Sequence, residues 1–167
     1  TSMEGMIEIG ASVTPISAIG VVRYEDAAYM LLSQVMDDME RVQNLMPCVA
    51  ASPTDMECAT QIAKSFGRRA WRRPLPDAEV VVLRDLIVSV GGDSGSFLVG
   101  LEIAFAAMLQ SPYFLYRFEY GDENGNLLPY EMASRLSFLL WNAPPDETLF
   151  AAADSGELST KEGLSTQ

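Results

Sequence analysis

The residues best suited to bind a charged ligand are four arginines within six positions, Arg68, Arg69, Arg72 and Arg73. Guanidinium groups at this density can bind a phosphate or a carboxylate through paired hydrogen bonds. Helical spacing, however, puts Arg68 with Arg72 on one face and Arg69 with Arg73 on another. Positive charge also stabilises the C-terminal end of a helix. We therefore favour a structural role for the cluster and keep anion binding as the alternative.

The chain contains no histidine, and many kinds of site depend on one. Ser-His-Asp and Cys-His nucleophiles need it, as do histidine-ligated zinc, copper and non-haem iron and the Cys-x-x-Cys-His attachment of haem c. Asp122, Asn124 and Asn126 imitate the start of a calcium loop, but Leu127 stands where that loop needs glycine. The sequence therefore predicts no catalytic, cofactor-binding or metal-ligating residue in this chain.

The two cysteines, Cys48 and Cys58, are too few for a four-cysteine metal site. We favour a disulfide between them, which would close a loop of about ten residues. The alternative is two buried free thiols in a reducing compartment.

Charge and hydropathy limit the partners of the chain. Its net charge is −12 with only 11 lysines and arginines, which argues against nucleic acid because phosphates require concentrated positive charge. The longest apolar stretch, Phe97 to Leu109, is too short to cross a bilayer. With 167 residues, 49% of them hydrophobic, the chain is long enough to bury a core as one compact body.

Apolar residues at three- and four-residue spacing, interrupted by proline and glycine, predict an all-α protein. We expect an orthogonal bundle of about six helices with an extended N-terminal arm. The arm covers 1–20, a four-helix unit with the arginine-rich motif covers 21–120, and 121–167 begins a further helical unit. The expected helices are 24–46, 53–73, 76–90, 96–110, 129–141 and 146–155.

Three features refine these limits. Ser52 with Asp55 is expected to cap the second helix, and Gly91 with Gly92 to end the third. Residues 113–120 alternate aromatic and charged side chains and fit either a short helical turn or a strand. A capping box formed by Ser159 and Glu162 announces a helix close to the last residue, so we expect that the parent sequence continues.

Three segments, in order, carry a family resemblance. Residues 66–79 resemble the motif F-x-R-R-A-F-R-R-P-L-T-x-x-E, with Trp71 and Pro76 as departures; residues 100–118 and 130–158 resemble two further segments of the same family. The chain is thus similar to the planctomycete-type cytochrome-associated proteins of unknown function. These are large secreted bacterial proteins that carry uncharacterised domains beside c-type cytochrome modules.

The resemblance implies a secreted or periplasmic parent, of which this chain is a fragment, and it implies that any haem c lies elsewhere in that parent. Partners would then be other domains of the same protein. We expect a non-catalytic helical scaffold or interaction domain. The alternatives are part of an extracellular cytochrome-linked redox enzyme, whose haem and active site lie outside this chain, and a module that binds carbohydrate or another small ligand through exposed Trp or Tyr.

The arginines of these motifs sit beside aromatic and apolar positions. Each guanidinium could tie helices together through carbonyls or carboxylates. We predict an architectural network that joins Arg68, Arg69, Arg117 and Arg135 to acids such as Glu102, Glu119, Glu131 and Asp146.

Overall fold

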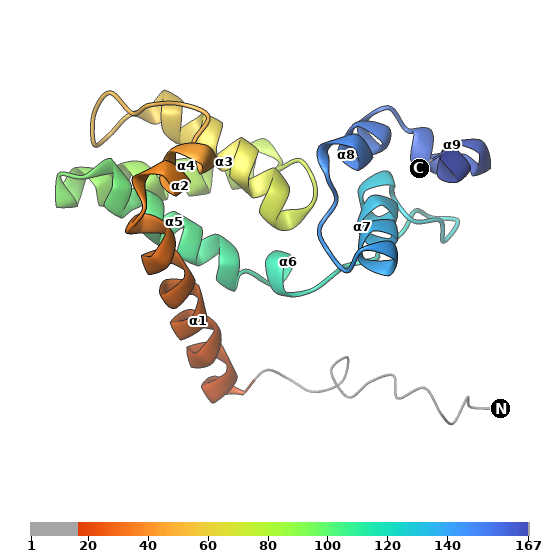
Figure 1. Cartoon of the computed structure of the whole chain (residues 1–167), viewed down its shortest axis with the longest axis horizontal. Helices are drawn as coiled ribbons and strands as arrows, with labels where there is room; N and C mark the ends of the chain where they lie inside the picture. The colour runs from red at the N-terminus through yellow and green to blue at the C-terminus, as the bar shows by residue number, and fades with distance from the viewer. Residues whose placement is uncertain (1–16, 167) are drawn as a thin grey trace.

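The computed structural model describes residues 17–166, in which nine α-helices, one 3₁₀ helix and no strand are found (Figure 1). The all-α prediction is therefore confirmed. The helices are α1 (Ala18–Met36), α2 (Met39–Leu45), α3 (Met56–Trp71), α4 (Asp77–Ser94), α5 (Phe97–Gln110), α6 (Pro112–Leu115), α7 (Pro129–Leu140), α8 (Glu147–Asp154), η2 (Glu157–Ser159) and α9 (Lys161–Thr166).

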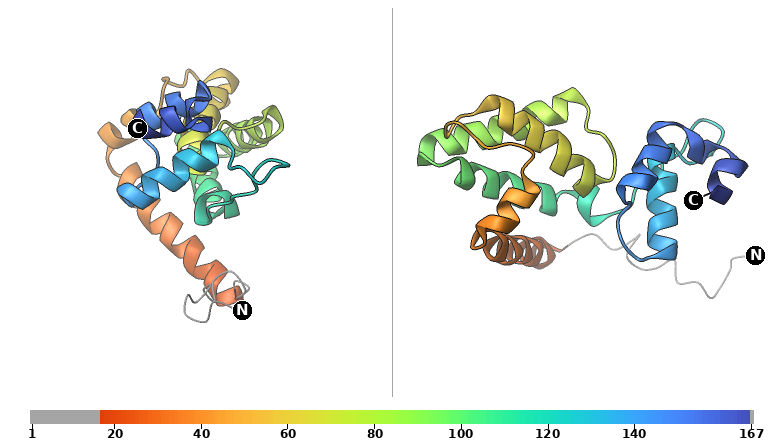
Figure 2. Two further views of the ribbon diagram at one scale, coloured as in Figure 1. Left: turned by 90° about the vertical axis from the view of Figure 1, so that its right-hand side faces the viewer. Right: turned by 45° about the horizontal axis from the view of Figure 1, so that its top comes forward.

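Helices α1 to α6 form a first lobe around α5, which packs against α4, α1 and α3 (Figures 1 and 2). Helix α5 is apolar on nearly all sides, as is typical of a helix surrounded by others. Its buried Leu101, Phe105 and Met108 meet Ile62 of α3 and Ile87 of α4 in one hydrophobic cluster. Phe66 and Phe105 stack with ring centroids 3.8 Å apart.

The end predicted for the third helix at Gly91 and Gly92 is wrong, because α4 continues to Ser94 and Gly95 ends it with φ of 72°. Gly91 is instead a contact residue: a Cβ built there would lie 2.2 Å from the backbone oxygen of Pro53. A Cβ at Gly100 of α5 would lie 2.2 Å from the backbone oxygen of Ile87. The two glycines therefore let backbones approach closely, which no side chain would permit.

The predicted helix 24–46 is two helices, since Asp38 interrupts it and accepts hydrogen bonds from the backbone N–H groups of Glu40 and Arg41. Asp38 also forms an ion pair with Arg41. Residues 18–20, expected in the arm, are the first turn of α1, capped by Ser17. Residues 1–16 of the expected arm lie outside the described residues.

Helix α3 begins three residues later than expected. Asp55, and not Ser52, is its N-cap, and its carboxylate accepts from the backbone N–H of Cys58 at 3.0 Å. The short acidic side chain satisfies a donor that the first turn leaves free.

A second lobe is formed by α7, α8, η2 and α9 around their own small cluster, which includes Ala133, Leu149 and Leu158 (Figure 1). The helices predicted at 129–141 and 146–155 are both present. Thr160, rather than Ser159, caps the last helix through the N–H of Gly163. No helix in residues 17–166 has the length and apolar character needed to span a membrane.

Candidate functional site

Arg72 lies where α3 ends, and it is the most deeply buried charged residue among those described, with 7% of its surface exposed. Its Nη2 donates to the backbone oxygens of Tyr113 at 2.6 Å and Tyr116 at 2.7 Å. Longer contacts, at 3.2 and 3.3 Å, reach the oxygen of Phe114. One guanidinium thus satisfies three carbonyls of α6 and of the segment that leads to the second lobe.

The backbone at Arg72 is left-handed, with φ of 57° and ψ of 27°. This conformation costs an L-residue about 1–2 kcal/mol, and the hydrogen bonds of the side chain offset that cost. Burial lowers the pKa of the Arg72 guanidinium, and the positive charge of Arg117 lowers it further. The group nevertheless stays charged, because the guanidinium of arginine does not lose its proton in proteins.

Arg73 makes a two-point ion pair with Glu79 of α4, at 2.9 Å for each nitrogen–oxygen contact. Its guanidinium lies 4.6 Å from the ring centroid of Tyr113 and 5.7 Å from that of Trp71. The hydrogen bonds that Arg73 donates to the Glu79 carboxylate raise the pKa of Arg73. This arginine therefore joins α3, α4 and α6.

Arg68 reaches across to the second lobe. Its Nη2 lies 2.6 Å from a carboxylate oxygen of Asp154 at the end of α8, and its guanidinium lies 4.9 Å from the ring centroid of Phe150. The hydroxyl of Tyr130, on α7, donates to the same carboxylate. The Tyr130 hydrogen bond and then the Arg68 hydrogen bond lower the pKa of Asp154, while burial and the Asp154 charge raise the pKa of Tyr130. We call the side chains of Arg68, Tyr130 and Asp154 the lobe clamp.

Of the other arginines in the predicted network, Arg135 meets one of the predicted acids, whereas Arg117 and Arg69 do not. Arg135 pairs with Glu119, and this hydrogen bond lowers the pKa of Glu119. The guanidinium of Arg117 lies 4.8 Å from the ring centroid of Phe138. Arg69 is exposed beside a shallow hollow between α2, α3 and α8.

Two of the predicted acids serve the backbone rather than an arginine. Glu131 accepts from the N–H groups of Tyr120, Gly121 and Leu128, and so closes the hairpin before α7. Asp146 is the N-cap of α8. Glu102 takes part in none of the ion pairs formed by residues 17–166. The network as drawn from the sequence needs correction at these positions, because helix ends and turns present N–H donors that compete for carboxylates.

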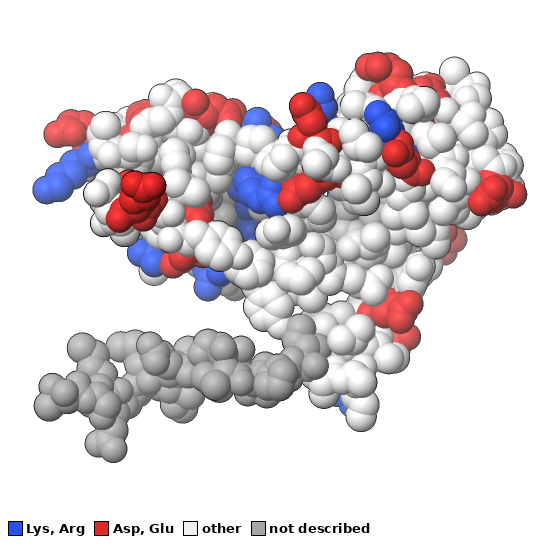
Figure 3. Space-filling model, turned by 180° about the vertical axis from the view of Figure 1, so that it is seen from behind, with Lys and Arg blue, Asp and Glu red and all other residues white. Residues whose placement is uncertain are grey.

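Between the lobes lies a hollow of about 180 Å³, which we call the junction hollow. Aromatic rings dominate its wall. The rings of Phe118 and Tyr120 are nearly parallel, with centroids 5.4 Å apart, and the rings of Tyr113 and Phe118 meet edge to face. Figure 3 shows a group of positive side chains near the notch between the lobes, with acidic side chains spread over the outer surface. The residues that line the hollow are Trp71, Arg72, Arg73, Tyr113, Tyr116, Arg117, Phe118, Glu119, Tyr120, Leu128, Tyr130, Glu131 and Ser134.

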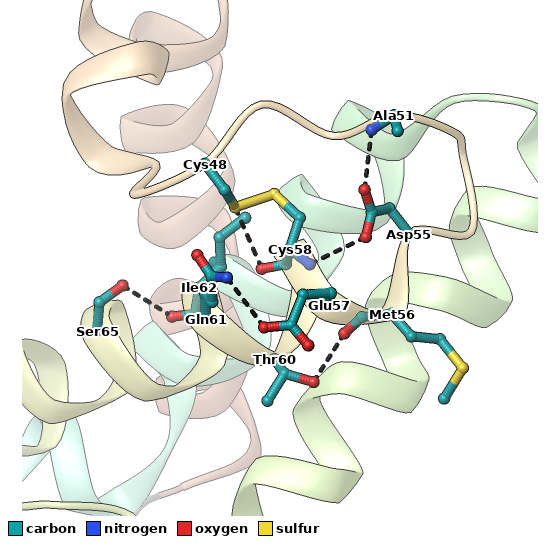
Figure 4. The surroundings of a disulfide bond; sticks show 10 residues. All are labelled: Cys48, Ala51, Asp55, Met56, Glu57, Cys58, Thr60, Gln61, Ile62 and Ser65. Carbon is teal, nitrogen blue, oxygen red and sulfur yellow. Dashed lines mark hydrogen bonds between the residues drawn. A yellow bond between two sulfur atoms is a disulfide. The ribbon is translucent and has the colours of Figure 1, made fainter.

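The predicted disulfide between Cys48 and Cys58 is present, with the two Cα atoms 5.7 Å apart (Figure 4). The bond closes a loop, which the Asp55 carboxylate stabilises by accepting hydrogen bonds from the N–H of Ala51 at 2.9 Å and from the N–H of Cys58. The hydrogen bond from Ala51, followed by that from Cys58, lowers the pKa of Asp55. A disulfide fits an oxidising compartment.

Two family models match the chain. Residues 58–119 match PSD5, protein of unknown function (DUF1595), and residues 127–167 match PSD4, protein of unknown function (DUF1592). The chain is therefore similar, over two successive segments, to domains of unknown function. No curated protein and no solved structure matches it.

The junction hollow draws its wall from both matched segments, since Trp71 to Glu119 lie in the first and Leu128 to Ser134 in the second. Within residues 17–166 no group of three or more His, Cys, Asp or Glu side chains is placed to hold a metal ion. What the arrangement offers is recognition and rigidity: ring faces, guanidinium groups and tied backbone.

Sequence reasoning missed Arg72 as the central tie and missed the hollow. The signal for Arg72 was its place two residues before Pro74, where a helix must end and an arginine can turn back on the chain. The signal for the hollow was the alternation of aromatic and charged residues over 113–120.

Proposed function

We propose that this chain is a non-catalytic helical scaffold in a secreted or periplasmic multidomain protein of the cytochrome-associated kind. The observation that carries the proposal is the use of the arginine-rich motif for joins inside the chain. Arg72 ties α3 to the segment between the lobes, Arg73 ties α3 to α4, and Arg68 ties α3 to α7 and α8 through the lobe clamp.

This arrangement supports a scaffold because it fixes the orientation of two helical lobes. Along the chain they are connected by residues 116–128, which contain no helix. Without the arginine contacts, a linker of that kind would allow the lobes to move, since domains joined by a small interface reorient by default. The disulfide supports the oxidising location of the proposed parent.

The partners that we propose are other domains of the same parent, and α1 supplies the supporting surface. Its side chains Ile19, Val22, Met30 and Leu31 are each more than half exposed, and in Figure 1 α1 projects from the body of the first lobe. Large apolar side chains gathered on one exposed element are typical of interaction surfaces.

Nuclear magnetic relaxation tests the scaffold directly. Backbone ¹⁵N relaxation of the full chain should give one correlation time for α3, α4 and α5 and for α7 and α8. The variant Arg68→Met should separate the two values, whereas Arg41→Met, which removes a solvent-exposed ion pair with Asp38, should not. Independent tumbling of the lobes in the unaltered chain would refute the scaffold.

Hydrogen exchange tests the proposed partners. The amides of α1 should exchange more slowly in the parent protein than in this chain alone, because docking protects them. Equal exchange of α1 in both would contradict a contact with other domains of the parent.

A further inference from the structure

The junction hollow has the size of a ring-shaped ligand. Its volume is about 180 Å³, slightly above the roughly 150 Å³ of an apolar cavity that admits benzene. One six-membered ring with a small substituent fits this space, and a larger ligand would have to extend into solvent.

The wall of the hollow is suited to a flat ring. Phe118 and Tyr120 lie with an interplanar angle of 5°, and Tyr120, with 74% of its surface exposed, leaves one face accessible. Tyr113 and Tyr116 approach Phe118 from the side, with centroids 5.6 and 6.3 Å away. Aromatic groups stack or meet edge to face at such distances.

The charges that line the hollow favour an anion. Arg73 is neutralised by Glu79, and Glu119 by Arg135. Arg117 takes part in none of the ion pairs formed by residues 17–166. The second carboxylate of the wall, Glu131, accepts three backbone N–H groups. Arg72 is held by the backbone oxygens of Tyr113 and Tyr116, so Arg117 is the guanidinium of this wall that is left for a ligand.

Two other ligand classes fit less well. A quaternary ammonium ion binds aromatic cages, but the guanidinium groups of Arg72 and Arg117 at this wall would repel it. A saccharide needs many hydrogen-bond partners, whereas the exposed surface of the hollow is mainly apolar and a buried hydroxyl without a partner is costly.

We propose that the junction hollow binds a small aromatic carboxylate, with its ring against Phe118 and Tyr120 and its carboxylate on Arg117. This inference goes beyond the scaffold, since it assigns a ligand site to the surface where the lobes meet. A planar guanidinium matches a carboxylate through two parallel hydrogen bonds.

Titration of the full chain with benzoate, followed by ¹H–¹⁵N chemical shifts, tests the site. Shifts should concentrate on residues 113–120 and 128–134, with a dissociation constant on the order of 1 mM for so small a ligand. Benzyl alcohol, which lacks the charge, should bind about 10-fold more weakly or not at all. In the variant Trp141→Phe, the only remaining tryptophan is Trp71, so its fluorescence gives a second readout from the wall of the hollow.

Variants separate the two halves of the site. Arg117→Gln should weaken benzoate binding at least about 10-fold while Arg117→Lys retains part of it, and Tyr120→Ser should weaken it as well. Arg41→Gln and Tyr24→Ser, which lie outside the hollow, should bind as the unaltered chain does. Unchanged melting temperatures would show that loss of binding is not loss of fold.

Three results would overturn the proposal. One is benzoate binding that Arg117→Gln leaves unchanged. Another is tighter binding of choline or of methyl glucoside than of benzoate, which would point to a cation or a saccharide. The third is the absence of shifts in residues 113–134 at 20 mM benzoate, about 20-fold above the expected dissociation constant. The scaffold can hold whether or not the ligand binds, because relaxation and ligand shifts are separate measurements.

Discussion

Replacement of Arg72 by methionine removes the guanidinium that ties α3 to residues 113–116 but keeps a long apolar side chain at the same place. Two strong hydrogen bonds disappear, those to the oxygens of Tyr113 and Tyr116. A hydrogen bond from a charged donor contributes about 1.5–3 kcal/mol. Tyr113 and Tyr116 are each 37% exposed, so water can partly replace the lost donors and the lower end of the range applies. We therefore expect a loss of about 3 kcal/mol in the free energy of unfolding.

The assay is equilibrium unfolding in urea together with a thermal melt. A loss of about 3 kcal/mol corresponds to a fall of about 6–12 °C in the melting temperature of a domain of this size. The amide of Tyr116, bonded to the oxygen of Pro112 at 2.9 Å, should also exchange faster, because α6 loses its tie. The matched control is Arg41→Met, which removes an exposed ion pair and should change stability by less than about 1 kcal/mol.

A second variant separates the side chain from the backbone. Arg72→Gly also loses the guanidinium but gains about 1 kcal/mol, because glycine adopts the left-handed conformation without strain. It also leaves the buried volume of the side chain empty, which costs about 2–5 kcal/mol, so it should be less stable than Arg72→Met. If Arg72→Met unfolds within about 1 kcal/mol of the unaltered chain, Arg72 is not the tie that its contacts indicate.

Three further predictions concern other parts of the fold. Reduction of the Cys48–Cys58 bond, with its sequence separation of 10, should lower the free energy of unfolding by about 2.7 kcal/mol. Urea unfolding with and without reductant measures this loss. Two titratable thiols in the untreated denatured chain would contradict the bond. Gly100→Ala should destabilise the chain by more than about 2 kcal/mol, because the added Cβ would collide with backbone atoms. The control Gly92→Ala should be neutral or stabilising through helix propensity, since its Cβ would meet only a side-chain methyl of Thr54 at 3.1 Å. Equal melting temperatures of the two variants would rule out close contact between α4 and α5. The pKa of Asp154 is lowered in the folded chain, so the lobe clamp stabilises the fold above about pH 4, the usual pKa of aspartate. This stability is lost as the pH falls further. Asp154→Asn should therefore show a weaker pH dependence of the melting temperature below about pH 4, and identical profiles of variant and unaltered chain would contradict the lobe clamp.

Local signals in the sequence determined much of this protein. The spacing of apolar residues predicted α3, α5, α7 and α8, and Pro129 marked the start of α7. The lack of histidine limited the chemistry before any contact was known. These features are visible in sequence because each depends on neighbours within one or two helical turns.

The tertiary structure decided where these signals compete. Gly91 was predicted to end a helix, yet α4 continues past it. Glycine is required at this position because the backbone oxygen of Pro53 lies where a side chain would be. Asp38 divided an apparently continuous helix by accepting two N–H groups. Either outcome agrees with local propensity, and packing selected one of them.

The arginine motif shows the same division most clearly. From the sequence, Arg68, Arg69, Arg72 and Arg73 form two pairs on two helix faces, with no indication of the acceptor of each. In the structure Arg72 meets the oxygen of Tyr116, 44 residues away, and Arg68 meets Asp154, 86 residues away. Which acceptor each guanidinium finds depends on how the two lobes close, and no local pattern encodes that. The sequence alone determined most of the helices and the lack of histidine. Only tertiary packing decided which arginines hold the fold and which one is left facing the junction hollow.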